Sequence, residues 1–220
     1  MVFQLLRTWA LLSCFVTPML AESLPGAAHP QIVVSVFNDA GVGQATILEG
    51  ERIAAEIYAQ AGLEAAWNNC STEPGPAAEE CLQRLGPGRI FLHIEHQPRT
   101  LDPDVYGVAF LGDGGAGAYC DLFYDRIEEL HRQSAASAGK ILGLVAAHEI
   151  GHLLLGTNAH SSVGIMRPQW QSQDFWHPQL GATSFSPQQA QKISARLAQM
   201  PSVEESPAEE RSHRRSADHW

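Results

Sequence analysis

The stretch HEIGHLLLGTNAHSSVGIM, which runs from His148 to Met166, decides how this chain is interpreted. Its first five residues have the H-E-x-x-H pattern of zinc sites. On a helix, His148 and His152 lie one turn apart on the same face, so both imidazoles can reach a single metal ion. Glu149 is offset around the helix and can accept a proton from a water molecule that the metal acidifies.

The residues around this motif indicate a helix from 137 to 155 that is buried on most sides. Its apolar surface is nearly continuous, as in ILGLVAA and LLL, and Gly156 is a typical helix stop. Uncompensated charge is costly inside a protein. His148, Glu149 and His152 on such a helix therefore favour a metal site over ordinary core histidines.

A catalytic zinc site needs a third protein ligand. One class of zinc peptidases takes it from a glutamate on a later helix, but no glutamate lies between His152 and Glu204. The residues by themselves leave four candidates, which are Asn158, His160, Asp174 and His177. His160 follows Gly156 by four residues, within reach of a chain that turns back.

The stretch resembles the metzincin metallopeptidases, most closely their matrixin-type branch. That family reads H-E-x-x-H-x-x-G-x-x-H, followed by a methionine-containing turn below the metal. AHEIGH at 147–152 matches the core of this motif, His160-Ser161 resembles the third ligand of matrixins, and Gly164-Ile165-Met166 resembles the methionine turn. The spacing departs from the family: the glycine and the third histidine follow His152 by four and eight residues instead of three and six.

The resemblance implies one catalytic zinc held by His148, His152 and His160, with Glu149 as the general base and Met166 as an apolar floor under the metal. It therefore implies a zinc-dependent endopeptidase that acts on peptide or protein substrates. The alternative is a zincin-like envelope protein that binds zinc or a peptide and cleaves little or nothing. The presence of Glu149 argues against this alternative, because a structural zinc needs no general base.

Periodicity and turn residues divide the chain into nine regular elements and indicate an α+β domain. The linker GDGGAG at 112–117 is too rich in glycine to be regular. We expect strands at 31–37, 63–67, 89–96, 105–111 and 118–124, and helices at 46–61, 125–132, 137–155 and 186–199.

The resemblance gives this α+β pattern a specific architecture. It implies a single zincin-like, metzincin-like domain with a twisted, mostly parallel sheet, a central active-site helix and a C-terminal helix after the methionine turn. It also implies an exposed edge strand that pairs with extended substrate through its main chain. The matching residues are Gly107, Val108, Ala109 and Phe110.

The N-terminal segment predicts the compartment of the protein. Residues 1–21 have the positive start and apolar run of a secretory signal peptide. We expect a secreted or periplasmic protein with a domain over 22–200, a disordered tail over 201–220 and no transmembrane segment in the mature chain. An alternative is a lipoprotein anchored at Cys14, after Leu11-Leu12-Ser13. The formal net charge of -10, without a basic stripe, argues against a nucleic-acid partner, and we expect a monomer.

The remaining cysteines suggest a small disulfide loop. Cys70 and Cys81 bracket a loop rich in proline and glycine, and an oxidising compartment would allow them to pair. Cys120 is then predicted to be a buried free thiol in a strand.

Three further groups of residues are weaker candidates for function. His93 and His96 lie three apart on an expected strand, so they should point to opposite sides and not share a metal. The acidic loop residues lack the spacing of a calcium loop, so calcium is not expected; they are Asp102, Asp104 and Asp113. Aromatic residues that could line a side-chain pocket or stabilise an oxyanion are Trp170, Trp176, Tyr106 and Tyr119.

Overall fold

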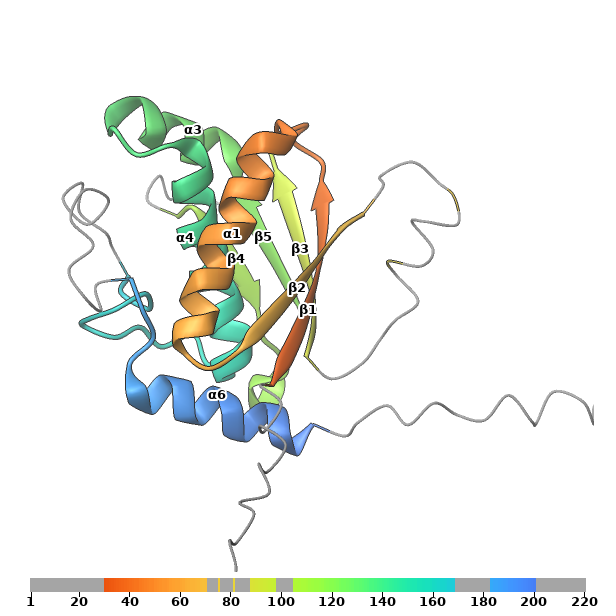
Figure 1. Cartoon of the computed structure of the whole chain (residues 1–220), viewed down its shortest axis with the longest axis vertical. Helices are drawn as coiled ribbons and strands as arrows, with labels where there is room; N and C mark the ends of the chain where they lie inside the picture. The colour runs from red at the N-terminus through yellow and green to blue at the C-terminus, as the bar shows by residue number, and fades with distance from the viewer. Residues whose placement is uncertain are drawn as a thin grey trace, which may run out of the picture.

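The computed structural model describes residues 30–70, 75, 81, 88–97, 105–168 and 183–200. Five strands form one twisted sheet in the order β2-β1-β3-β5-β4 (Figure 1). The first four pair in parallel, and β4 lies at the edge, antiparallel to β5. This confirms the predicted mostly parallel sheet. The strands are Gln31–Asn38 (β1), Glu64–Cys70 (β2), Arg89–Glu95 (β3), Gly107–Phe110 (β4) and Tyr119–Phe123 (β5).

Four helices accompany the sheet in the described part of the chain. Figure 1 shows α1 and α4 side by side across one face of the sheet, with α6 near the end of α4. A short 3-10 turn at Asp113–Gly115 lies inside the glycine-rich linker that we expected to be irregular. The helices are Gln44–Gln60 (α1), Tyr124–Gln133 (α3), Ala138–Leu155 (α4) and Pro187–Gln199 (α6).

The two faces of the sheet are packed differently. Along β1, Ile32, Val34 and Val36 belong to the main core under the helices. Phe37 belongs to a second, smaller cluster with Cys70, Cys81 and Phe91. Side chains alternate between the two faces of a strand, so this second cluster covers the face opposite α1 and α4.

The helices α1 and α4 approach closely because glycines line their contact. A Cβ atom on Gly143 would lie 2.5 Å from the Gly50 carbonyl oxygen, and one on Gly50 would lie 3.3 Å from the Gly139 carbonyl oxygen. Larger side chains at these positions would push the helices apart. The glycines therefore fix where α4 lies against the rest of the core.

The helix α4 forms the centre of the core. Nearly all its residues are buried, Ser137 caps its N-terminus by accepting a hydrogen bond from the Lys140 N–H, and Gly156 ends it in the left-handed conformation at φ 63°. Its length and composition would also allow it to cross a membrane, but 89% of it is buried inside the fold. Its apolar character is that of a core helix.

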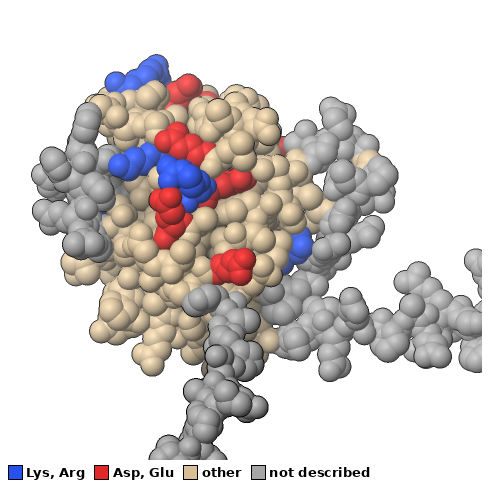
Figure 2. Space-filling model, viewed as in Figure 1, with Lys and Arg blue, Asp and Glu red and all other residues tan. Residues whose placement is uncertain are grey.

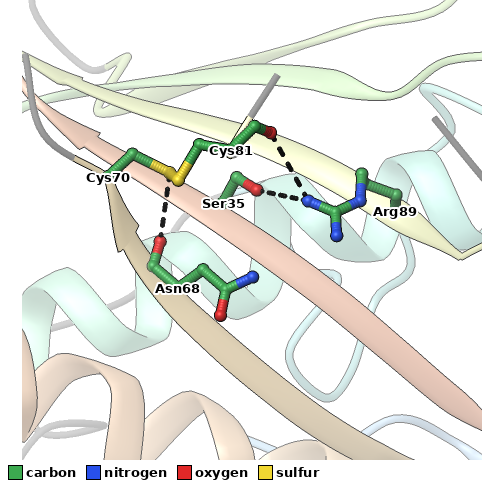
Figure 3. The surroundings of a disulfide bond; sticks show 5 residues. All are labelled: Ser35, Asn68, Cys70, Cys81 and Arg89. Carbon is green, nitrogen blue, oxygen red and sulfur yellow. Dashed lines mark hydrogen bonds between the residues drawn. A yellow bond between two sulfur atoms is a disulfide. The ribbon is translucent and has the colours of Figure 1, made fainter. Parts of the chain in front are cut away.

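Cys70 and Cys81, which the sequence left open as a pair, form a disulfide with Cα atoms 5.9 Å apart (Figure 3). It lies on the face of the sheet opposite α1 and α4, where the Arg89 guanidinium donates hydrogen bonds to the Ser35 hydroxyl at 2.8 Å and to the Cys81 carbonyl at 3.5 Å. Cys120 is a buried free thiol on β5, as predicted.

The surface charges are mixed on the face that carries α1. Figure 2 shows acidic and basic side chains interspersed there. Arg52 and Glu56, one turn apart on α1, form one such ion pair. On this face the acidic excess of the sequence does not form one large acidic patch.

The boundary that differs most from expectation is the end of β2. We predicted a strand over 63–67, but β2 continues to Cys70, because Asn68, Asn69 and Cys70 pair with Ser35, Val36 and Phe37 of β1. Asparagine is uncommon in strands, so its composition hid this continuation. The predicted signal segment at 1–21 and tail at 201–220 lie outside the described residues.

Candidate metal centre

Three imidazole rings converge at the C-terminal half of α4. The ring centroids of His148 and His152 are 4.7 Å apart, and that of His160 lies 5.2 and 5.0 Å from them. One ligand nitrogen from each ring can be chosen so that all lie within 4.8 Å of one another. The rings of His148 and His152 are buried and that of His160 is exposed. This group could hold one metal ion.

Backbone carbonyls orient the two buried rings. The Nδ1 atom of His148 lies 2.8 Å from the Ile165 carbonyl oxygen, and Nδ1 of His152 lies 2.8 Å from that of Thr157. A carbonyl only accepts hydrogen bonds, so each Nδ1 carries the proton and each Nε2 carries a lone pair. Orienting acceptors of this kind are typical of histidines that bind metals.

The arrangement of the Nε2 atoms favours a cation between the rings. These two atoms are only 3.0 Å apart, and two lone pairs that face each other repel. A proton would relieve the repulsion, but burial, together with the neighbouring histidines, lowers the pKa of His148 to about 4. Burial also lowers the pKa of His152. A metal ion fits better, and three imidazole nitrogens are a donor set that suits zinc.

Glu149 lies next to this group on α4 and is buried. Burial raises the pKa of its carboxyl group to about 8, and a hydrogen bond from the Ala109 backbone N–H acts in the opposite direction. The carboxyl group therefore reaches β4, the edge strand of the sheet. It can hold or release a proton near neutral pH.

Met166 is fully buried under α4. A Cβ atom on Gly151 would lie 2.6 Å from the Met166 sulfur and 3.0 Å from the Phe185 ring. The glycine of the HEIGH motif is therefore needed for the close approach of the turn to the helix. The neighbouring Ile165 provides the carbonyl that orients His148, so this turn both packs under the histidines and aligns one of them.

The segment after α4 carries His160 back toward the helix. Its first step is the left-handed Gly156, after which the Thr157 N–H bonds back to the His152 carbonyl at 3.2 Å. Near His160, the Ser161 N–H donates to the Met166 carbonyl at 2.8 Å and the Ser161 hydroxyl to the Val163 carbonyl at 2.7 Å. The longer spacing between His152 and His160 is accommodated by this turn.

Helix α6 also contacts this turn, and the sequence did not indicate that contact. Gln189 completes the capping box of α6 with Ser186, and its side-chain amide also donates to the Ser161 hydroxyl at 3.4 Å. Its only sequence signal was the capping pattern. The carbonyls of Thr157 and Ile165 had no side-chain signal at all, because any residue supplies a carbonyl.

The four residues expected to bind substrate form β4, with alternating orientations. Gly107 and Ala109 are buried, Val108 is half-buried, and the Phe110 side chain is exposed. Tyr119 stacks on Phe91, which belongs to the cluster on the face of the sheet opposite α4. It is therefore badly placed to stabilise an oxyanion at the histidines.

None of the other described candidate residues belongs to the three-histidine group. His93 stacks on Phe37 and pairs with Asp39, and His96 pairs with Asp125, so these two histidines do not meet at a common site. Asn158, Asp113 and Tyr106 are described and lie outside the three-histidine group. The remaining candidates, Asp102, Asp104, Trp170, Asp174, Trp176 and His177, lie outside the described residues.

Comparison of the sequence with family models and with curated proteins finds no match. Among solved structures, a zinc-dependent peptidase from Methanocorpusculum labreanum (strain Z) is similar over 73% of this chain and 99% of that chain, with a TM-score of 0.49 and 12% sequence identity. A likeness at this level does not assign family membership. The functional interpretation therefore depends on the geometry of the site.

Proposed function

We propose that this protein is a secreted zinc-dependent endopeptidase of the metzincin type. The observation that carries the proposal is the convergence of ligand nitrogens from His148, His152 and His160 within 4.8 Å of one another, beside the buried carboxyl group of Glu149. Three protein ligands leave the fourth position of a tetrahedral zinc open. Such an open position is typical of catalytic zinc sites, whereas structural sites are closed by four protein ligands.

The chemistry divides between the metal and the chain. Zinc, when bound, would supply Lewis acidity that acidifies water and polarises the scissile carbonyl group. The carbonyls of Ile165 and Thr157 hold the rings of His148 and His152 with Nε2 toward the metal position. Glu149 removes one proton from the attacking water and delivers it to the amide nitrogen as the peptide C–N bond breaks.

The surroundings of Glu149 suit a general base. In the metal-free chain, burial raises the pKa of Glu149 to about 8. A zinc ion beside the carboxyl group would lower this pKa toward the working pH, where a base works best. The Ala109 N–H stabilises the charged form. The carboxylate can therefore take a proton and release it again within one reaction cycle.

We further propose that an extended peptide substrate pairs with the open edge of β4, from Gly107 to Phe110. The Phe123 N–H donates to the Tyr106 carbonyl at 2.9 Å, and hydrogen-bonded pairs alternate along an antiparallel ladder. Gly107 and Ala109 therefore direct their backbone groups away from β5. The Ala109 N–H bonds to Glu149, so the Gly107 N–H and the carbonyls of Gly107 and Ala109 are the groups that would pair with substrate. Backbone pairing supports recognition that tolerates many substrate sequences.

The disulfide between Cys70 and Cys81 supports the proposed location outside the cytoplasm. Disulfides persist mainly in oxidising compartments, such as the periplasm and the exterior. Together with the signal-like segment at 1–21, it favours secretion or a periplasmic location. We propose a monomer that carries one zinc and acts on peptides or proteins.

The deciding experiment compares the zinc-loaded protein with its Glu149→Gln variant on a complex peptide library read by mass spectrometry. We expect the wild type to cleave, a chelator to stop cleavage and zinc to restore it. The variant should keep one zinc and lose about 10²–10⁴-fold in kcat. A wild type that binds one zinc and cleaves nothing would instead support the zincin-like binding protein without peptidase activity.

A further inference from the structure

The strand β4 contacts the side chain of Glu149 at two points. The Ala109 N–H bonds to its carboxyl group. Two residues earlier, a Cβ atom on Gly107 would lie 2.7 Å from Cγ of Glu149 and 3.1 Å from its Oε1. The glutamate therefore occupies the space that any other residue at 107 would fill with its side chain.

Space, not backbone conformation, requires the glycine at 107. The positive-φ residues of the described chain are all glycines, and Gly107 is not one of them, so another residue could adopt its backbone angles. Glycine weakens a strand interior and often marks a place where another group approaches closely. In this four-residue strand the approaching group is the carboxyl-bearing side chain of Glu149.

We propose that Gly107 is a positioning residue for Glu149, because its missing side chain leaves the recess that fixes where the carboxyl group lies. The consequence for catalysis rests on the proposed function of Glu149 as the general base. A catalytic group displaced by about 1 Å can lose about 10²-fold in rate. A methyl group at 107 would displace Glu149 without removing a metal ligand, so zinc binding should be retained.

The first test is a double-mutant cycle on the stability of the full chain without metal. Gly107→Ala is measured in the wild type and in a Glu149→Ala background, by the midpoint of denaturant unfolding. Removal of the glutamate side chain empties the recess. We expect the drop in midpoint caused by Gly107→Ala to shrink by at least half in the Glu149→Ala background.

A matched control separates this effect from general crowding of the sheet. A Cβ atom on Gly117 would meet the Phe110 carbonyl oxygen at 2.3 Å, and no atom of Glu149 is among its nearest neighbours. Gly117→Ala should therefore cause the same drop with and without Glu149. A Cβ atom at position 107 would also lie 2.9 Å from the Asp121 carbonyl oxygen. Equal drops for Gly107→Ala in both backgrounds would assign its whole effect to that carbonyl and overturn the proposal.

Two further outcomes are decisive. If Gly107→Ala prevents folding and Gly107→Ala/Glu149→Ala restores it, the positioning role is supported; if neither variant folds, it is overturned. With zinc bound, we expect Gly107→Ala to lower kcat by about 10–100-fold, with KM and zinc affinity within about twofold of wild type. A chain that shows the coupling but has no peptidase activity would uphold the positioning role and contradict the proposed function.

Discussion

The three histidines of the candidate site are held in two different ways. His148 and His152 are buried on α4, and a backbone carbonyl fixes each ring through Nδ1. His160 is exposed and comes from the turn that follows Gly156. Its imidazole contacts the rings of the other two histidines, and within the described part of the chain no hydrogen bond orients it.

This difference implies a division of work in metal binding. The helix pair is oriented before any metal arrives, so little conformational freedom is lost when it binds. The ring of His160 must be ordered on binding, which lowers its net contribution. We infer that α4 determines whether the metal binds and that the turn adjusts how tightly.

The largest effect should distinguish the two kinds of ligand directly. We expect His152→Ala to abolish stoichiometric zinc binding, because it removes one of the two preorganised nitrogens. His160→Ala should keep measurable zinc binding but lower the affinity. The loss should exceed about 10–100-fold, which is what removal of a group that only orients a ligand costs. Zinc titration against a competing chelator measures both affinities.

The two variants also check the identity of the third ligand. Each should keep the wild-type helical content by circular dichroism, so that loss of zinc reports on the ligand and not on unfolding. An unchanged zinc affinity in His160→Ala would mean that another group completes the site.

The next effect tests the contact between α4 and the methionine turn. Gly151→Ala would place a methyl group 2.6 Å from the Met166 sulfur, and such overpacking costs about 1–3 kcal/mol. Because the turn also carries the Ile165 carbonyl and His160, we expect zinc affinity to fall together with stability. Thermal unfolding and zinc titration measure the two effects.

Gly143→Ala is the matched control. Gly143 lies on the same helix, but its added Cβ atom would lie 2.5 Å from the Gly50 carbonyl oxygen of α1, away from the turn. It should lower stability by a similar amount and leave zinc affinity unchanged. Equal zinc affinities for the two alanine variants would show that the turn repacks independently of the metal site.

A smaller effect is expected in the pH dependence of the metal-free protein. The pKa of His148 falls from 6.5 to about 4 and that of Glu149 rises from 4.5 to about 8 on folding. As pH falls from 6.5 to 4, the unfolded chain gains a proton that native His148 does not, and stability is lost. As pH rises from 4.5 to 8, the unfolded chain loses a proton that native Glu149 keeps, and stability is lost again.

Between pH 4.5 and 6.5 these two contributions cancel. Between pH 6.5 and 8, Glu149 should cost about 2 kcal/mol, at about 1.4 kcal/mol per pH unit. Denaturant unfolding with a chelator present should show this loss in the wild type and in His160→Ala, but not in Glu149→Gln. A loss of the same size in Glu149→Gln would assign it to other groups.

The sequence predicted the helix half of the site better than the turn half. Helical periodicity placed His148, Glu149 and His152 on one buried helix, and Gly156 and Ser137 marked its ends, because these signals are local. The role of Gly107 could not be predicted, since its requirement arises from Glu149, distant in the sequence. Likewise, the carbonyls of Thr157 and Ile165 align the rings through the backbone, which carries no residue-specific signal.

The position of His160 shows the same limit. Residue types left four candidates for a third ligand, and only the resemblance to metzincins selected His160, at a spacing two residues longer than the family pattern. The turn that accommodates the extra residues depends on Ser161 and on Gln189 of α6. Gln189 lies 28 residues later than Ser161, and no periodic pattern connects them.

The smallest predicted effect therefore concerns Ser161. Ser161→Ala removes the hydroxyl that donates to the Val163 carbonyl and accepts from Gln189, which should cost about 1 kcal/mol of stability. Because this hydroxyl orders the turn next to His160, zinc affinity should fall by about tenfold or less. The control is Ser184→Ala, which loses a hydroxyl bond to Gln60 and keeps the backbone bond from the Ile165 N–H. Equal zinc affinities for Ser161→Ala and the wild type would mean that His160 finds its position without help from the turn, and the contrast between the two kinds of ligand would then reduce to burial alone.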